Sequence, residues 1–257
     1  MRGADERQAL DASSPWWGEH VARYQFALPL VRERATLDVA CGTGLGLAIL
    51  QTQASRVVGV DGDDAAVLSA RRAAPTATVL QADALALPFA DESFAAVTTF
   101  ETIEHLQNRA QFLREIVRVL SKDGVCVLST PNAHYTKPVA GKPRNPFHVH
   151  EYEPSELVSE LEPFFSSIKI FGQVLNSRFV VPPFWDDQQR LPRTLWNQLG
   201  LTLRRIGNRM PARARDVMSE KLWGHRFFPV PSDYAFLESE VAEAPVSVVI
   251  CREPRKP

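Results

Sequence analysis

A glycine-rich turn directly after an apolar run sets the strongest constraint on this chain. Residues Ala35 to Gly46 read A-T-L-D-V-A-C-G-T-G-L-G: an apolar strand with one acid, Asp38, then glycines at alternate positions and a helical run. Glycine lets the backbone turn sharply and approach a ligand without a Cβ in the way. The N–H groups at the start of the following helix face the same place. The pattern predicts a nucleotide-type pocket.

The spacing of the glycines separates the kinds of nucleotide. A dinucleotide fingerprint is G-x-G-x-x-G, whereas here the third glycine, Gly46, follows Gly44 after one residue. An acid inside the strand, at Asp38, is a poor neighbour for a pyrophosphate and a good one for a cationic amino-acid group. The turn therefore favours a nucleoside that carries a positive charge.

Two further acids follow apolar strands. One ends the run Val57 to Asp61, and the other, Asp83, follows the run Ala77 to Leu80. A carboxylate at the end of the second strand is placed to accept both ribose hydroxyls of an adenosine. Three acids at successive strand ends therefore favour one adenosine site over three unrelated loop residues.

With D-V-A-C-G-T-G-L-G at the glycine turn, these motifs resemble those of the class I S-adenosylmethionine-dependent methyltransferases. The resemblance implies S-adenosylmethionine as cofactor, with Asp83 beside the adenine amino group. The segment L-P-F-A-D-E-S-F-A-A-V departs from the family at Ala95, where an acid is usual. The expected cofactor-binding residues are Arg23, Asp38, Ala40, Cys41, Gly42, Gly44, Asp61, Gly62, Asp83, Ala84, Phe100 and Glu101.

An amphipathic helix from Trp16 to Leu30, ending near Pro29, precedes the glycine turn. The resemblance implies that this helix lies over the methionine end of the cofactor, where Arg23 or Tyr24 reaches its carboxylate. Packing against the sheet is the alternative role for Arg23.

Apolar runs alternate with helical patterns along the chain, which predicts a mostly parallel sheet covered on both faces. The expected fold class is α/β, a Rossmann-like class I methyltransferase with a seven-stranded sheet. The resemblance places the last run antiparallel beside the fifth and leaves the sixth at the edge. The runs are Ala35–Ala40, Val57–Asp61, Ala77–Leu80, Phe94–Phe100, Gly124–Thr130, Ser167–Gln173 and Val246–Cys251.

The length between the last two runs exceeds what a plain fold of this kind needs. We expect residues 1–174 and 245–257 to form the core with its N-terminal cap helix, and residues 175–244 to form a helical lid. From Arg178 to Arg226 there are ten basic and four acidic residues, a formal charge of +6. This insertion is either a lid with a solvated basic face or a surface for a phosphate-bearing substrate or an anionic membrane. One helical face is formed by Leu195, Leu199, Leu203, Ile206 and Met210.

Composition narrows the class of protein. The formal charge of −1 over 257 residues gives no sign of a nucleic-acid partner. No apolar stretch is long enough for a membrane span or a signal core. Three cysteines without metal-ligand spacing fit reduced thiols. We therefore expect a cytoplasmic protein.

The methyl acceptor is expected beside the ends of the fourth and fifth runs. The candidate catalytic residues there are Glu104, His105, His148 and His150. Methyl transfer from a sulfonium needs the nucleophile held in line and, for a hydroxyl, a base that removes its proton. If the turn after Phe100 is helical, Glu101, Glu104 and His105 share one face. His148 and His150 alternate on an extended segment and so share another.

Two interpretations of these residues compete. In one, His105 or His150 is the general base for a hydroxyl acceptor. In the other, Glu101, Glu104, His105 and His150 hold a divalent metal. The second rests on E-x-x-E-H, T-P-N and a later histidine, which are similar to the small-RNA 2′-O-methyltransferase family. However, E-H-L is also found in metal-free quinone-biosynthesis methyltransferases.

Taken together, E-x-x-E-H-L, S-T-P-N and N-P-F-H-x-H-E-Y most resemble bacterial methyltransferases of polysaccharide, glycan and specialised-metabolite pathways. The resemblance implies O-methylation of a sugar, a glycan or a glycosylated or lipid-linked intermediate. One alternative is a small aromatic or quinone-like acceptor in an apolar pocket lined by Phe179, Phe184 and Trp185. A rival of another class is a cofactor-binding protein without catalysis, or an interaction module anchored by the basic insertion. RNA methylation is a further alternative, which the weak basic balance of the chain disfavours.

Overall fold

The strand-forming runs of the sequence pair into a single sheet. The computed structural model describes residues 14–175, 179 and 192–256. Among these, eight strands form one sheet in the order β3-β2-β1-β4-β5-β8-β6-β7. The strands are β1 (Ala35–Val39), β2 (Arg56–Asp61), β3 (Thr78–Gln81), β4 (Phe94–Phe100), β5 (Leu120–Pro131), β6 (Phe165–Leu175), β7 (Tyr234–Leu237) and β8 (Val246–Pro254).

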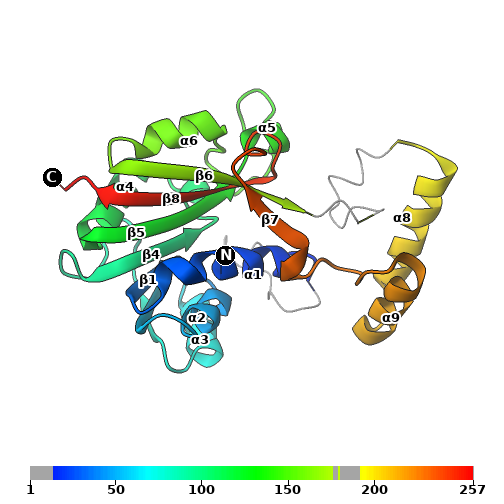
Figure 1. Ribbon diagram of the computed structural model, residues 1–257, viewed down its shortest axis with the longest axis horizontal. Helices are drawn as coiled ribbons and strands as arrows, with labels where there is room; N and C mark the ends of the chain where they lie inside the picture. Colours follow the sequence, from blue (N-terminus) through cyan, green and yellow to red (C-terminus); the bar gives the residue numbers. More distant parts are fainter. Residues whose placement is uncertain (1–13, 176–178, 180–191, 257) are drawn as a thin grey trace. The chain divides into compact units, whose positions relative to one another are not determined.

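The predicted strand directions are confirmed. β1 pairs in parallel with both β2 and β4, β2 pairs in parallel with β3, and β4 pairs in parallel with β5. β8 is antiparallel to both β5 and β6 and lies between them (Figure 1). The expectation that the sixth strand is the edge strand was wrong, because β7 follows β6 in the sheet. A run as short as Tyr234–Leu237 shows too little periodicity to be read as a strand from sequence.

Helices connect the parallel strands. Two of them begin with a side-chain cap: Asp63 accepts from the backbone N–H of Ala66 at 2.8 Å, and Asn108 from that of Gln111 at 3.2 Å. The first helix continues past Pro29 to Val31, one residue beyond the predicted range. The helices are α1 (Trp17–Val31), α2 (Leu45–Leu50), α3 (Asp64–Ala73), η1 (Ile103–His105), α4 (Arg109–Val119), α5 (Ala133–Thr136), α6 (Pro154–Leu161), α8 (Leu195–Gly207), α9 (Ala212–Trp223) and η2 (Pro231–Asp233).

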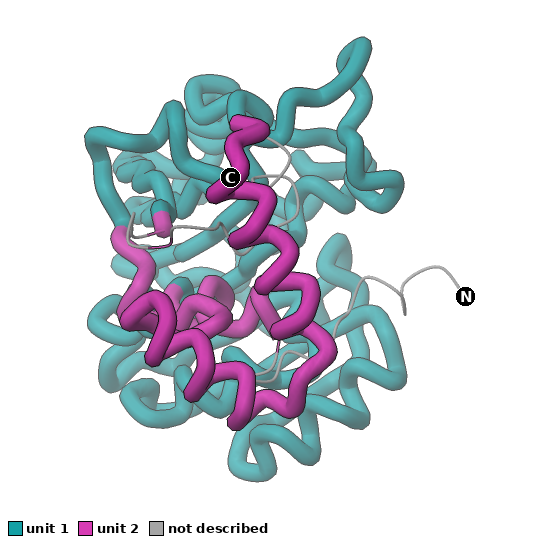
Figure 2. Tube along the Cα trace, turned by 90° about the vertical axis from the view of Figure 1, so that its right-hand side faces the viewer, with its two compact units in different colours: residues 1–7, 23–174, 236–257 teal, residues 8–22, 175–235 magenta. Residues whose placement is uncertain are grey.

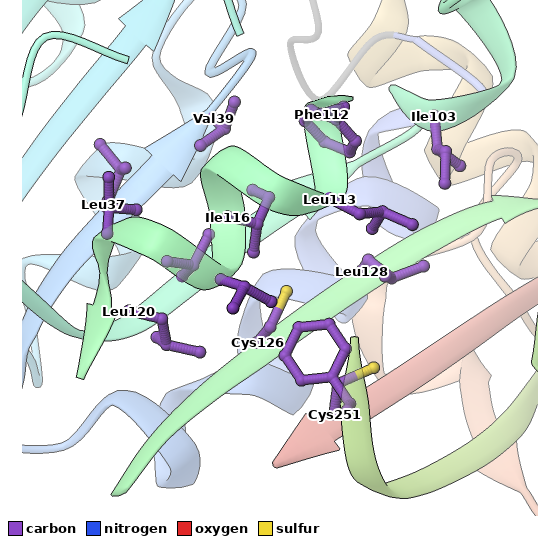
Figure 3. Packing of buried hydrophobic residues seen from close by; sticks show 14 of the residues in the cluster. Leu37, Val39, Ile103, Phe112, Leu113, Ile116, Leu120, Cys126, Leu128 and Cys251 are labelled. Atoms are coloured by element: carbon purple, nitrogen blue, oxygen red, sulfur yellow. The ribbon is translucent and has the colours of Figure 1, made fainter. Parts of the chain in front are cut away.

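The sheet buries apolar side chains on both of its faces, as its two-sided apolar runs predict. On one face, Phe112, Leu113 and Ile116 of α4 pack with Leu37 and Val39 of β1 (Figure 3). A second core cluster on the described chain brings together side chains from α1, α2 and α3 with other strand positions. Because both faces of the sheet are covered by apolar packing, polar functional residues are expected at the carboxyl ends of the parallel strands.

The chain divides into two compact units, coloured separately in Figure 2. The first comprises residues 1–7, 23–174 and 236–257, and the second residues 8–22 and 175–235. The second unit contains α8 and α9. There the guanidinium carbons of Arg204 and Arg215 lie 4.5 and 5.0 Å from the ring centre of Phe227. Within the described residues, no helix is long and apolar enough to cross a bilayer.

Candidate functional site

The glycine turn leaves an open space at the end of β1. Ala40, Gly42 and Gly44 alternate in the left-handed region, with φ of 58°, 54° and 88°. A Cβ at Gly44 would lie 2.6 Å from the Cα of Ala70, so α3 packs directly on this glycine. A Cβ at Gly42 would meet nothing within 4 Å. The turn is therefore packed tightly against α3 at Gly44 and faces open space at Gly42. A bound nucleoside needs such a space.

Asp61, at the end of β2, ties two strand ends together. Its Oδ2 accepts from the backbone N–H of Gly42 at 3.0 Å, and its Oδ1 accepts from that of Asp63 at 2.9 Å. Gly62 follows in an open position, where a Cβ would meet only the carbonyl oxygen of Ala82 at 3.9 Å. Asp83, after β3, is exposed and accepts from the N–H of Leu85. The predicted acids thus lie along neighbouring strand ends.

Asp38 lies fully buried beneath this turn. Thr98 Oγ1 donates to its Oδ1 at 2.6 Å, and the Tyr24 hydroxyl donates to its Oδ2 at 3.1 Å. Burial raises the pKa of Asp38 to about 7, although these two hydrogen bonds act to lower it. Gly46 makes room for Tyr24, since a Cβ there would lie 1.9 Å from the Tyr24 Cζ. Tyr24, predicted to reach the cofactor, instead bonds Asp38. A cofactor contact by Asp38 itself stays a prediction.

Replacing Asp38 with asparagine should flatten the pH dependence of stability. Burial raises the pKa of Asp38 from 3.8 to about 7, so the folded state binds more protons between these values. The free energy of unfolding of the wild type therefore falls as the pH rises from about 4 through about 7. Over that pH range, we expect the free energy of unfolding of the wild type to fall by roughly 3 kcal/mol relative to that of Asp38→Asn. Thermal melts across this pH range measure it. The exposed Asp123→Asn is the control, and parallel curves for Asp38→Asn and the wild type would contradict the account.

The buried Arg23 forms an ion pair with the partly exposed Glu101. Arg23 Nη1 lies 3.0 Å from Glu101 Oε1, and its Nε donates to Gln173 Oε1 at 2.7 Å. Ser129 Oγ also donates to Glu101 Oε1, at 2.7 Å. The backbone of Glu101 is left-handed, with φ of 52°, a strained conformation of the kind that gathers at functional sites. Arg23, predicted to bind the cofactor carboxylate, thus holds Glu101 in this structure.

The turn after β4 is a single 3-10 turn that begins after Glu101. The predicted common face of Glu101, Glu104 and His105 was wrong, because only Ile103–His105 is helical and the left-handed Glu101 directs its carboxylate to Arg23. Glu104 has no exposed surface. Its Oε2 accepts from Thr130 Oγ1 at 2.9 Å, while its Oε1 has no hydrogen-bond partner among the described residues. Burial, and then the charge of Glu101, raise the pKa of Glu104 well above its ordinary value.

His105 places one ring nitrogen towards Glu104. Its Nδ1 lies 3.1 Å from the carbonyl oxygen of Phe147, which can only accept, so Nδ1 carries a proton in this arrangement. Its Nε2 lies 3.8 Å from Glu104 Oε1. In neutral imidazole one nitrogen donates and the other accepts. His105 therefore presents an accepting Nε2 on the side of Glu104.

Backbone hydrogen bonds bring a distant segment to this turn. The N–H groups of Val149 and His150 donate to the carbonyl oxygen of Glu104 at 2.7 and 3.2 Å. The His148 ring lies edge-on to that of His105, with centres 4.8 Å apart. One ligand atom from each of Glu104, His105 and His148 lies within 4.8 Å of the others. These three residues are called the His–Glu cluster below.

His148 is itself held by two side chains. Its Nδ1 lies 2.6 Å from Glu151 Oε1, and its Nε2 lies 2.9 Å from the side-chain nitrogen of Asn145. Burial acts to raise the pKa of Glu151, but hydrogen bonds from His148 and Thr136 outweigh it and the pKa is lowered. An ionised Glu151 therefore orients the His148 ring.

His150, predicted beside His105 as base or metal ligand, is placed elsewhere. Its Nε2 lies 2.8 Å from Glu156 Oε1, and its ring lies against Tyr152. It belongs to the wall of a neighbouring cavity of about 290 Å³ rather than to the His–Glu cluster. That wall is formed by Ala133, Pro138, Gly141, Pro143, His150, Glu151, Glu153 and Glu156.

Sequence reasoning missed four residues that support the site: Thr130, Asn145, Glu151 and Gln173. Thr130, Asn145 and Glu151 lie within the quoted motifs S-T-P-N and N-P-F-H-x-H-E-Y. The spacing of His148 and Glu151, three residues apart, could have predicted their contact, because side chains at this spacing can meet within a turn. For Gln173, which meets Arg23 across 150 residues, the sequence holds no comparable signal.

The sheet order, with strand-end acids around a glycine turn, is that of the class I S-adenosylmethionine-dependent methyltransferases. A methyltransferase of Archaeoglobus fulgidus described as S-adenosylmethionine-dependent has this fold, with a TM-score of 0.57, 17% identity and coverage of 92% of this chain and 94% of that one. Residues 37–128 match the model of a family described as a methyltransferase domain. The chain thus carries a class I methyltransferase domain, a class whose cofactor is S-adenosylmethionine.

Curated relatives agree with this class. The chain is 38% identical over 152 residues to a probable S-adenosylmethionine-dependent methyltransferase of Mycobacterium tuberculosis, covering 59% of this chain and 56% of that protein. It is 36% identical over 117 residues to a demethylmenaquinone methyltransferase of Clavibacter sepedonicus, covering 43% and 47%. The chain therefore spans about half the length of the curated relatives it matches.

Proposed function

We propose that this chain transfers a methyl group from S-adenosylmethionine to a hydroxyl of a sugar or another polyhydroxylated acceptor. The observation that carries the proposal is the His–Glu cluster at the ends of β4 and β5, beside the acidic cavity. A hydroxyl must lose its proton as it is methylated, so a positioned base is useful. The cluster supplies that base on the acceptor side.

The open edge over β1 to β3 fits the adenosine part of the cofactor. Gly42 leaves room for close approach, and Asp61 offers carboxylate oxygens for the ribose hydroxyls. Asp83 follows the next strand, on the side assigned to the adenine. When bound, the cofactor supplies an activated methyl group on a sulfonium. The role of the chain is then to hold the acceptor in line and to take its proton.

His105 is the proposed base. The bond from its Nδ1–H to the Phe147 carbonyl holds the tautomer that leaves Nε2 as the accepting nitrogen. The buried Glu104 carboxyl lies 3.8 Å from Nε2, beside the nitrogen that takes the acceptor proton. His148, edge-on to His105 and held by Glu151, closes the other side of this site.

The cavity wall favours a polyhydroxylated acceptor over a quinone-like one. Glu151, Glu153, Glu156 and His150 offer hydrogen-bond acceptors, which match the hydroxyl donors of a sugar. An apolar ring would call for aromatic walls. Of the aromatic residues proposed for such walls, Phe184 and Trp185 lie outside the described residues, and Phe179 packs on His225 with ring centres 4.3 Å apart.

An acceptor screen tests the proposal. The full chain is incubated with S-adenosylmethionine carrying a labelled methyl group, together with free sugars, nucleotide sugars, lipid-linked sugars or quinols. We expect label on a sugar hydroxyl. Label on quinols alone would favour the alternative acceptor class. Cofactor binding without transfer to any acceptor, even in an extract, would favour a non-catalytic binding module.

A second candidate role for the His–Glu cluster is to hold a divalent metal that binds the acceptor hydroxyls. Glu104 Oε1, which is buried close to His105 and His148 and has no hydrogen-bond partner within the described part of the chain, favours it. Under this candidate, EDTA abolishes methyl transfer and Mn²⁺ restores it. Calorimetry should then show about tenfold or greater loss of Mn²⁺ affinity in His148→Ala, but not in the exposed His134→Ala. Methyl transfer that persists in EDTA removes the metal role and leaves His105 as the base.

A further inference from the structure

Helix α8 presents its apolar side chains outwards. Leu195 is 89% exposed, Trp196 82%, Leu199 51% and Ile206 52%. In a surface helix of a water-soluble domain the apolar stripe normally faces the core. These four residues, called the outer stripe below, are large apolar groups left on the surface, and such patches mark interaction sites.

The opposite side of α8 is occupied by an arginine and two glycines. Gly200, Arg204 and Gly207 are buried. The guanidinium of Arg204 lies over the Phe227 ring, and a Cβ at Gly207 would lie 2.4 Å from the same ring. The inner face of α8 is therefore fixed by close packing on Phe227. The helix cannot rotate to bury the outer stripe without breaking this packing.

Basic side chains border the outer stripe. Arg205 near the end of α8 and Arg209 in the turn directly after it are both exposed. From residue 192 to 226 the chain holds eight basic and two acidic residues, a formal charge of +6, although the whole chain carries −1. All the basic residues of this segment other than Arg204 and Arg215 are exposed. Positive charge is thus concentrated around an exposed apolar helix face.

We propose that α8 docks the protein on the surface of a bilayer that contains anionic lipids. With 13 residues, α8 is about 20 Å long, too short for a hydrocarbon core of roughly 30 Å, so it lies in the plane of the interface. The outer stripe enters the boundary between headgroups and acyl chains. Trp196 suits the interface, and Arg205 and Arg209 reach back to the lipid phosphates. This proposal is independent of the proposed reaction.

Charge argues against the two other occupants of such a face. A second copy would place the same +6 segment against itself, and like charges across an interface disfavour association. A soluble phosphate ligand would satisfy the arginines but leave the outer stripe in water. An anionic bilayer covers both the apolar and the basic groups.

Vesicle flotation tests the docking. The full chain is mixed with vesicles of phosphatidylcholine alone, or of phosphatidylcholine with phosphatidylglycerol. We expect flotation with the mixed vesicles only, and less of it at high salt. Leu199→Gln and Trp196→Gln should each weaken binding about tenfold, and Arg205→Glu with Arg209→Glu at least as much. Matched controls on α3, Leu68→Gln and Arg72→Glu, are both exposed and should bind as the wild type does. Circular dichroism verifies that each variant is folded.

The fluorescence of Trp196 gives a second readout. Emission of the wild type should shift to the blue on anionic vesicles, and this shift should be absent in Trp196→Phe. Three results would each overturn the proposal: no flotation with anionic vesicles, flotation unchanged by Leu199→Gln, or a concentration-dependent dimer that Leu199→Gln dissociates. None of them bears on whether the chain transfers methyl groups.

Discussion

Replacing Asp61 with alanine is expected to weaken the binding of S-adenosylmethionine by about a hundredfold or more. A hydrogen bond to a charged group contributes about 1.5–3 kcal/mol, and two ribose hydroxyls are available to one carboxylate. Asp61 also accepts a hydrogen bond from the backbone N–H of Gly42, so the loss of the carboxylate loosens the turn that faces the cofactor. Isothermal titration calorimetry measures the affinity. The exposed Asp64→Ala, at the start of α3, is the matched control.

A modified cofactor separates the ribose contact from the support of the turn. The wild type should bind a 2′-deoxy analogue of S-adenosylhomocysteine more weakly than the parent compound, whereas Asp61→Ala should bind the two almost equally. If the variant still discriminates between them as the wild type does, Asp61 acts only through Gly42. Unchanged affinity for the parent compound would remove the ribose assignment altogether.

Replacing His105 with alanine is expected to lower kcat by about 10²–10⁴-fold with little change in cofactor affinity. The range is the usual contribution of a positioned general base. His105 follows β4 on the proposed acceptor side, whereas Asp61 and the glycine turn lie at the ends of β2 and β1, so the cofactor should bind normally. Labelled methyl transfer measures the rate, and calorimetry measures the affinity for S-adenosylhomocysteine.

His134→Ala is the control for this substitution. His134 is exposed, and its ring lies 3.2 Å from Glu153 rather than in the His–Glu cluster. We expect it to keep most of the activity. A rate in His105→Ala equal to that of the wild type would move the chemistry to another residue. A parallel loss of cofactor affinity would instead indicate that His105 supports the fold of the turn after β4.

Local patterns in the sequence were sufficient for the strands and for the acids that follow them. Apolar runs, glycines and strand-end carboxylates act within a few residues, so Asp61 and Asp83 could be assigned to one edge before the fold was known. The placement of β8 between β5 and β6 came from the resemblance, because strand pairing over such separations leaves no local signal. The short β7 was missed for a different reason, because a run of four residues shows too little periodicity.

The acceptor side depended on contacts between distant segments. His148 and His150 were expected to share a face, yet the bonds from Val149 and His150 to the Glu104 carbonyl set His148 beside His105. His150 is turned to Glu156 instead. Glu101 does not share the predicted helical face, because its backbone φ of 52° is left-handed. Residue spacing predicts which side chains share a face only where the backbone stays regular.

The sequence by itself predicted the alternation of strands and helices, the acids that follow β2 and β3, and a shared helical face for Leu195, Leu199 and Ile206, because each follows from local spacing. Only the tertiary structure decided which histidine joins Glu104 and His105, and that the stripe of α8 faces outwards. Periodicity defines a helix face but not its direction. The packing of Arg204 and Gly207 on Phe227 supplies that direction.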